Sequence, residues 1–164
     1  MLVLTSLLSS CGFTLRSSDV ISSSYSSLTL NLQQPNSEFA QQLRRSLVNS
    51  NVSLLNPGEE QTADGIPVLS VSAEQINIRP VTVNPLARAA QYEIRLSTTV
   101  GLVLGEEILI GPENLFVQRV YLEDTENISG NLEEAKVIQS EMRRDLVNQV
   151  LRRMEAAEPI TFAN

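Results

Sequence analysis

The sequence predicts an α+β fold, in which a mixed four-stranded sheet with the element order β-α-β-β-β-α carries two helices packed on one face. Two observations support this prediction. Four segments alternate apolar and polar residues with the period of two that a half-buried strand requires, and two segments repeat apolar residues every three or four positions, as an amphipathic helix does. One helix precedes an uninterrupted run of three strands and the other follows it, which is typical of α+β proteins.

The first strand and the first helix are both short. Leu28–Leu32 reads LTLNL and alternates strictly. After Pro35, either Asn36 or Ser37 can cap a helix, because a short polar side chain accepts a hydrogen bond from the free N–H groups of the first turn. The apolar residues of this helix recur at four-residue spacing: Phe39, Leu43 and Leu47. The helix forms a crossover to the next strand, which we expect to be right-handed.

Three longer strands follow, and the short connections that contain Pro or Gly predict an antiparallel meander. Val68–Arg79 changes its alternation between Ala73 and Ile76, which indicates a bulge or a strong twist. Gln91–Gly105 alternates most clearly. One face carries apolar residues from Tyr92 to Leu104, and the other carries Glu93, Arg95, Ser97 and Thr99.

The third of these strands, Asn114–Asp124, is followed by a long helix. In the strand, Leu115 and Val117 alternate with Phe116 and Val120. Asn131 and Glu134 have the spacing of a capping box, which predicts the helix start. Its core-facing stripe is Ile138, Met142, Leu146, Val150 and Met154, joined by Ala135, Val147 and Leu151.

Charge and residue usage exclude several functions. The chain has 12 basic and 19 acidic residues, which argues against a nucleic-acid partner. It has no histidine and one cysteine, so the common catalytic triads and zinc ligand sets cannot be assembled. Lys136 and Ser140 are one helical turn apart, but we interpret them as exposed helix surface. Adjacent carboxylates in turns make poor acid/base pairs. We therefore predict no catalytic residue, no metal site, no cofactor and no enzyme activity.

The N-terminus, MLVLTSLLSSCGFTLR, contains the only cysteine, Cys11. It follows a short apolar run and two serines, as the lipidated cysteine of a lipoprotein follows its signal peptide. In that interpretation Cys11 carries an S-diacylglycerol and an N-palmitoyl chain. The alternative is an ordinary buried thiol. Residues 1–10 carry no Lys or Arg, whereas a signal peptide normally begins with positive charge; a truncated signal would account for this.

These patterns divide the chain into four parts. Residues 1–10 form the signal peptide, and residues 11–27 form the lipidated cysteine and a flexible tether, since Ser17–Ser27 contains seven serines in eleven residues. Residues 28–157 form one α+β domain, and residues 158–164 form a C-terminal tail. No later segment approaches the roughly 18 apolar residues of a membrane-spanning helix. The protein is therefore predicted to be anchored by lipid.

The block Cys11-Gly12-Phe13-Thr14-Leu15-Arg16 resembles the start of the LptE family of lipopolysaccharide-assembly lipoproteins. The order of the AQYEIRLSTTVGL strand, the FVQRVY strand and the C-terminal helix agrees with that family. The resemblance implies an outer-membrane lipoprotein on the periplasmic side. It would plug an LptD-type β-barrel in a 1:1 complex, support assembly of that barrel and help deliver lipopolysaccharide to the outer leaflet. Gly12 after the cysteine fits release to the outer membrane.

In the family, basic residues near the hairpin before the AQY-type strand are implicated in contacting lipopolysaccharide phosphates. The resemblance carries this role to Arg88. The family's second basic position does not transfer, because Asn131 stands near it, so Arg79 and Arg95 are hypothesised to compensate. Two other classes stay open. One is an outer-membrane lipoprotein scaffold for another envelope assembly. The other is an enzyme with an unmodified Cys11 and a pocket of convergent polar groups.

Overall fold

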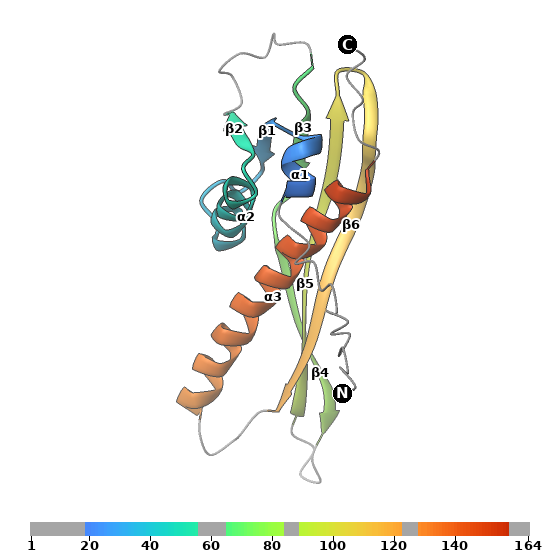
Figure 1. Ribbon diagram of the computed structural model, residues 1–164. Helices are drawn as coiled ribbons and strands as arrows, with labels where there is room; N and C mark the ends of the chain where they lie inside the picture. The colour runs from blue at the N-terminus through green and yellow to red at the C-terminus, as the bar shows by residue number, and fades with distance from the viewer. Residues whose placement is uncertain (1–18, 56–64, 84–88, 123–127, 158–164) are drawn as a thin grey trace, which may run out of the picture.

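The computed structural model describes residues 19–55, 65–83, 89–122 and 128–157, and it confirms the α+β class. The strands β4, β5 and β6 form a long blade, and α3 crosses it obliquely (Figure 1). In chain order the elements are α1 (Asp19–Ser24), β1 (Ser27–Leu32), α2 (Glu38–Asn49), β2 (Ser53–Leu55), β3 (Val68–Val71), β4 (Gln75–Val83), β5 (Ala89–Leu104), β6 (Glu107–Leu122) and α3 (Ile128–Ala156).

The sheet has six strands, so the prediction of four was wrong. β1 pairs in parallel with β2 and β3, whereas β3, β4 and β6 are antiparallel to β5. Because β6 occupies one edge of β5 along its length, β3 and β4 share the other edge, one after the other. The predicted antiparallel meander is confirmed.

Two features account for the additional strands. The change of alternation in the segment Val68–Arg79 divides the single predicted strand into β3 and β4. β2 is only three residues long, which is too short to show a period, and it pairs with the start of β1.

Where the strand pairing is interrupted between β3 and β4, one backbone hydrogen bond and several side-chain hydrogen bonds satisfy the backbone groups. The Ser72 N–H donates to the Thr99 carbonyl at 2.9 Å, and the Thr99 N–H donates to Ser72 Oγ at 2.8 Å. Thr98 Oγ1 donates to the Ser72 carbonyl at 3.1 Å, and the Ala73 N–H donates to Gln33 Oε1 at 2.8 Å. The chain therefore leaves the regular ladder without orphaning its backbone groups.

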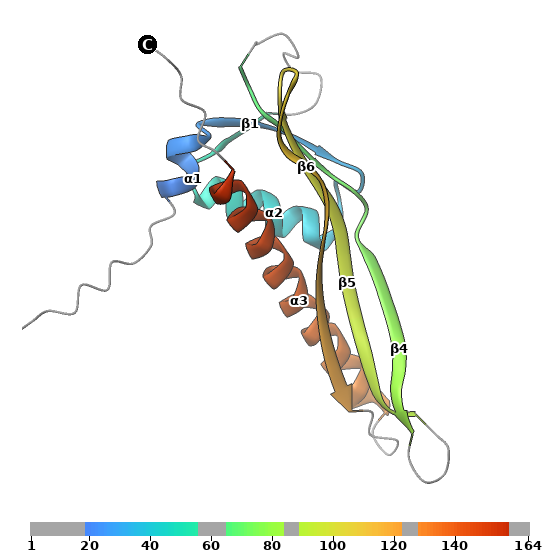
Figure 2. The ribbon, with the colours of Figure 1, turned by 90° about the vertical axis from the view of Figure 1, so that its right-hand side faces the viewer.

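The helices lie on one face of the sheet, and α1 joins the two that were predicted (Figure 2). Ser37 is the N-cap of α2, since its Oγ accepts from the Ala40 N–H at 3.1 Å. The capping box predicted at Asn131 was wrong. α3 begins at Ile128, which places Asn131 inside the helix, where it is largely buried.

We call the helix-covered side of the sheet the inner face and the opposite side the outer face. The α3 stripe is confirmed as core: Met142, Leu146, Val150 and Met154 are buried and Ile138 packs against them. On the sheet, they meet the inner-face residues of β5 and β6. These are Ile94, Leu96, Val100, Leu102, Leu115 and Val117.

The serine-rich segment differs from the predicted tether over residues 19–27. Part of it forms α1, and the side chains of Ile21 and Tyr25 are each only 1% exposed. Tyr25 Oη donates a buried hydrogen bond to the Met154 carbonyl at 3.2 Å. Two apolar residues four positions apart thus suffice to dock a segment of otherwise polar composition on α3.

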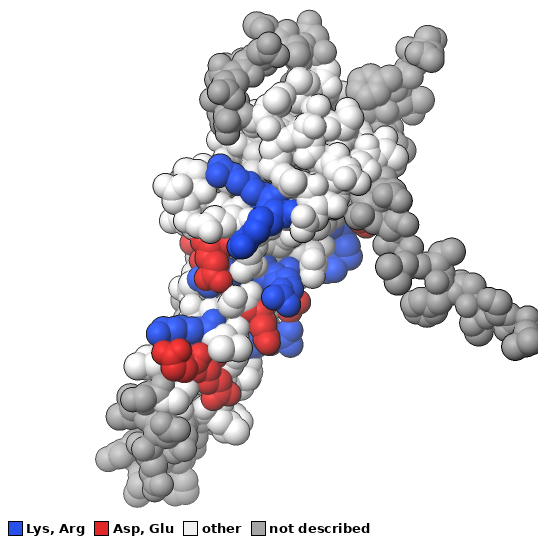
Figure 3. Space-filling model, turned by 60° about the vertical axis from the view of Figure 1, so that its left-hand side comes forward, with Lys and Arg blue, Asp and Glu red and all other residues white. Residues whose placement is uncertain are grey.

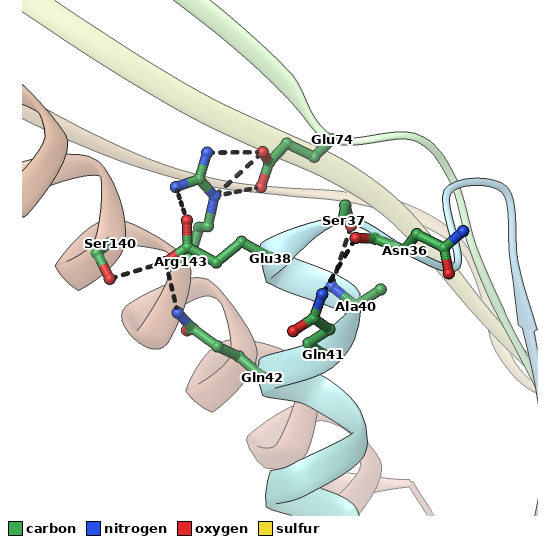
Figure 4. A network of polar contacts seen from close by, with 9 residues as sticks. All are labelled: Asn36, Ser37, Glu38, Ala40, Gln41, Gln42, Glu74, Ser140 and Arg143. Atoms are coloured by element: carbon green, nitrogen blue, oxygen red, sulfur yellow. Dashed lines mark hydrogen bonds and ion pairs between the residues drawn. The ribbon is translucent and has the colours of Figure 1, made fainter.

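A largely buried arginine ties three elements together (Figure 4). Arg143 of α3 forms a forked pair with Glu74, with Nε–Oε2 at 2.9 Å, and its Nη1 reaches Glu38 of α2 at 2.7 Å. The Arg143 and Glu74 side chains are only 12% and 10% exposed. Burial alone would lower the pKa of Arg143, but the hydrogen bonds and charge of Glu74, with the charge of Glu38, raise it. The guanidinium therefore stays charged and fixes α3 relative to the strand break.

The Tyr25→Phe variant tests the docking of the serine-rich segment. Loss of the hydrogen bond should lower the free energy of unfolding by about 1 kcal/mol at neutral pH. Burial raises the pKa of the Tyr25 phenol above 10.0, so the folded protein holds this proton more tightly than the unfolded chain. The stability is thus fully present below pH 10.0 and falls as the pH rises above it. Urea unfolding should show a smaller alkaline loss in Tyr25→Phe; equal losses would contradict the burial.

The Arg143→Ala variant leaves Glu74 without its cation and should lower the free energy of unfolding by about 3 kcal/mol. The double variant Arg143→Met, Glu74→Leu should recover most of that loss, because an apolar pair needs no desolvated charge. Urea unfolding measures both effects.

A matched control is Arg119→Ala. It breaks the Arg119–Asp145 pair, whose side chains are about half exposed, and should cost under about 1 kcal/mol. Equal losses for Arg143→Ala and Arg119→Ala would refute the bridging role of Arg143.

Candidate functional site

The outer face of the three long strands is the candidate functional surface. Ile94 and Leu96 of β5 are buried on the inner face, so the period of two directs Glu93 and Arg95 outward. The register places Arg79 of β4 opposite Glu93. The outer face of the blade thus brings together two of the three arginines singled out by the sequence.

Beside these arginines, β6 presents a row of exposed apolar side chains. Phe116, Val120 and Leu122 alternate along the outer face of β6 and are 43%, 56% and 65% exposed. Strand alternation does not require them to be apolar, because Leu115 and Val117 already supply the core contacts of this strand. Clustered exposed apolar side chains mark interaction surfaces.

Arg95 is held by an aromatic ring. Its Cζ lies 4.0 Å from the centroid of the Phe116 ring, a cation–π contact. Within the described residues, no carboxylate forms an ion pair with Arg95. Among the described residues, the charge of Arg95 thus meets an aromatic ring and no acid, so it can still attract an anion.

Arg79 differs from Arg95 because it already has an acidic partner. Its Nε lies 2.8 Å from Glu93 Oε1, and this hydrogen bond, with the charge of Glu93, raises the pKa of Arg79. Arg95 is the diagonal neighbour of Arg79 across the β4–β5 pair, a separation of about 7–8 Å. The two cations can therefore reach one ligand, and of the two only Arg79 has an acidic partner among the described residues.

Two predicted site residues, Cys11 and Arg88, lie outside the described residues. Sequence reasoning missed the roles of Glu93 and Phe116. The alternation of β5 and β6 already set both on the outer face, but the strand register that pairs Glu93 with Arg79 is visible only in the structure.

The helical side of the molecule carries charges of both signs. Acidic and basic side chains intermix along the band below the uncharged upper part of this view (Figure 3). Lys136 bonds Glu133 at 2.9 Å and Ser140 donates to Glu38 at 3.0 Å. Each residue of the considered Lys136–Ser140 pair thus has another partner, which agrees with a structural role.

The described part of the chain contains no group of three or more side chains suited to holding a metal ion. None of its helices combines the length and the apolar composition needed to cross a membrane.

Comparison with known proteins assigns the family. Residues 25–154 match the LptE family, described as lipopolysaccharide-assembly. The chain belongs to the LptE family. The match covers α2, the whole sheet and α3 up to residue 154, so it includes the outer face of the blade. A comparison with curated protein sequences finds no match.

Solved structures share the LptE-family fold. The rare lipoprotein B from Shewanella oneidensis aligns with a TM-score of 0.70 and 21% identity, covering 79% of this chain and 94% of that chain. An uncharacterised lipoprotein B from Nitrosomonas europaea aligns at 0.68 and 17%, covering 88% and 91%. A minor lipoprotein from Acinetobacter baumannii aligns at 0.63 and 20%, covering 80% and 92%. At these identities the likeness establishes the fold.

Proposed function

We propose that this LptE-family protein is an outer-membrane lipoprotein that plugs an LptD-type β-barrel, supports assembly of that barrel and contacts lipopolysaccharide on its way to the outer leaflet. The family assignment supports the pathway. The observation that carries the finer proposal is the outer face of the blade, where exposed apolar side chains lie beside Arg95, which has no acidic partner among the described residues. The role is one of binding and support, and we assign it no catalysis.

The chemistry of the outer face suits a barrel lumen. The interior of a wide transmembrane barrel is polar, so a plug needs polar and charged groups among its contacts. On the outer face, Asn77, Gln118 and Arg95 form one row across three strands, while Phe116 and Val120 supply apolar area. α3 packs on the inner face of β5 and β6, whereas none of the described helices covers the outer face, so we assign the partner contact to the outer face.

Anchoring by lipid is the second part of the proposal. Cys11 would carry an S-diacylglycerol and an N-palmitoyl chain, placing the protein on the periplasmic side of the outer membrane. Several acyl chains anchor stably, because each buried methylene contributes about 0.8 kcal/mol. The three structural relatives are lipoproteins by name, which supports this assignment.

The third part concerns lipopolysaccharide. Arg95 is the strongest phosphate ligand among the described arginines of the blade, since Arg79 shares its charge with Glu93. Arg88 joins it by family resemblance. Arginine binds phosphate through paired N–H groups, which the edge of the Arg95 guanidinium can supply.

Reversing the charge of Arg88 and Arg95 together should weaken lipopolysaccharide binding about tenfold or more, since each charge-assisted contact contributes on the order of 1.5 kcal/mol. Titration of purified protein with lipopolysaccharide measures this. The matched control is Arg44→Glu with Arg45→Glu on α2, which makes the same change in net charge away from the outer face. Unchanged binding in the Arg88, Arg95 variant would remove the proposed site.

Expression behind an intact signal peptide in a Gram-negative host tests the plug itself. Extraction of membranes in mild detergent should recover one large β-barrel per protein, and mass spectrometry should find Cys11 acylated as the N-terminal residue. An acylated protein without a barrel would favour a scaffold for another envelope assembly. An unmodified Cys11 would contradict the anchor.

A further inference from the structure

We propose that a row of three polar side chains on α3 keeps the free edge of β6 from pairing with β6 of a second copy of the protein. The row is Asp145, Gln149 and Arg153, and each of its members immediately precedes a buried residue of the α3 stripe. The row therefore runs beside the core contact, on the flank of α3 that faces β6 (Figure 2). This inference goes beyond the proposed barrel partner and does not depend on it.

Among the described strands, β6 pairs with β5 alone, so its other edge is free. The direction of its backbone groups follows from Thr99 of β5, whose N–H and carbonyl both bond Ser72 on the β3 side. Asn114 of β6 lies opposite Thr99 and is therefore in a non-hydrogen-bonded pair, with its own backbone groups pointing away from β5. Because this direction repeats every two residues, the backbone groups of Phe116 and Gln118 also point to the free edge.

Gln149 occupies a backbone group of this edge directly. Its Nε2 donates to the Phe116 carbonyl oxygen at 3.2 Å. That oxygen is one of the acceptors to which an added strand would bond, because an unpaired edge offers its N–H and C=O groups to another chain. A second strand therefore has to displace the Gln149 amide before it can pair at Phe116.

Two ion pairs flank this contact. Arg119 Nη2 lies 2.6 Å from Asp145 Oδ2, and Arg153 Nη2 lies 2.6 Å from Glu113 Oε2. The four side chains are between 36% and 53% exposed, and ion pairs in contact with solvent contribute at most about 1 kcal/mol each to folding. The buried stripe already holds α3 on the sheet. The main effect of these pairs is therefore to keep the α3 side chains over the edge of β6.

The upper part of the β6 edge is interrupted in a different way. Val100 pairs with Glu113 and Leu102 pairs with Ile110, so the register shifts between these two pairs. The same part of β6 contains Pro112, which has no N–H to donate. Bulges and prolines are means by which edge strands avoid pairing. The α3 row covers the stretch below them, where the register with β5 is continuous.

This regular stretch of β6 is complementary to itself. When two copies pair antiparallel about Gln118, Phe116 of one copy lies opposite Val120 of the other, and the two-fold axis makes both halves of the contact identical. An aromatic residue opposite a β-branched residue is a favourable cross-strand pair, and both side chains are exposed on the outer face. A second copy of the chain is therefore the strand that fits this edge and that the row excludes.

The test removes the row from the full chain and measures self-association of the purified protein by sedimentation velocity. The variant Asp145→Ser, Gln149→Ala, Arg153→Ser keeps the net charge and the α3 stripe. It should form dimers with an affinity at least about tenfold higher than that of wild type. Adding Gln118→Pro should return it to the monomer, since the Gln118 N–H points to the free edge and its removal breaks no hydrogen bond to β5.

The matched control is the variant Glu133→Ser, Gln41→Ala, Lys136→Ser. It likewise removes an exposed ion pair and a glutamine amide that donates to a backbone carbonyl, in bonds that do not involve β6. This variant should stay as monomeric as wild type. Urea unfolding should show similarly small losses of stability in both triple variants, so that self-association cannot be attributed to unfolding.

Three outcomes would overturn the inference. The first is a folded row variant that stays monomeric. The second is a dimer that persists with Gln118→Pro, because it would form elsewhere on the molecule. The third is a wild-type dimer that Gln118→Pro dissociates, because the edge would then be open despite the row. If the triple variant does not fold, Gln149→Ala alone decides by the same measurement. None of these measurements uses the barrel or lipopolysaccharide, so their failure is distinct from a failure of the proposed function.

Discussion

Burial of the α3 stripe against the inner face of the sheet is the constraint on which the other features depend. Each fully buried Met, Leu or Val of that stripe contributes roughly 1.5–3 kcal/mol. Because strand side chains alternate, burying Ile94 and Leu96 under α3 obliges Arg95 to face outward. The charged groups at the rim then fix where the helix lies, with Arg143 joining it to α2 and to the strand break. The outer face is available to a partner because none of the described helices covers it (Figure 2).

Most of the fold was predictable because periodicity reports burial directly. The long strands, the stripe of α3 and the cap at Ser37 all follow from residues within one element. The elements that were predicted wrongly have a common cause: tertiary contacts determine them, and those contacts cannot be read from the local sequence pattern. β2 is defined only by pairing with β1. α1 is docked by Ile21 and Tyr25 in a segment whose composition is that of a tether, and the start of α3 at Ile128 overrides the capping pattern at Asn131.

The sequence predicted on which face of the sheet the site residues lie, but it did not predict which residues they contact. Alternation placed Glu93 and Arg95 together on the polar side of β5, and the structure agrees. The difference between Arg79, which has an acidic partner, and Arg95, which lies on an aromatic ring, depends on the register of β4 and β6 against β5. The strand register depends on loop geometry and on bulges, and neither can be predicted reliably from the sequence.

The break between β3 and β4 has a consequence for how the molecule opens. Among the described strands, β4 pairs with β5 alone, and its inner-face residues Ile76 and Ile78 remain about half exposed. β4 can therefore detach from β5 while β1, β2 and β3 stay paired, with Ser72 as the joint. We therefore expect native-state hydrogen exchange to show a resistant upper unit and a lower unit that opens at a smaller free energy. Local unfolding would then begin at the lower end of the blade and stop at Ser72.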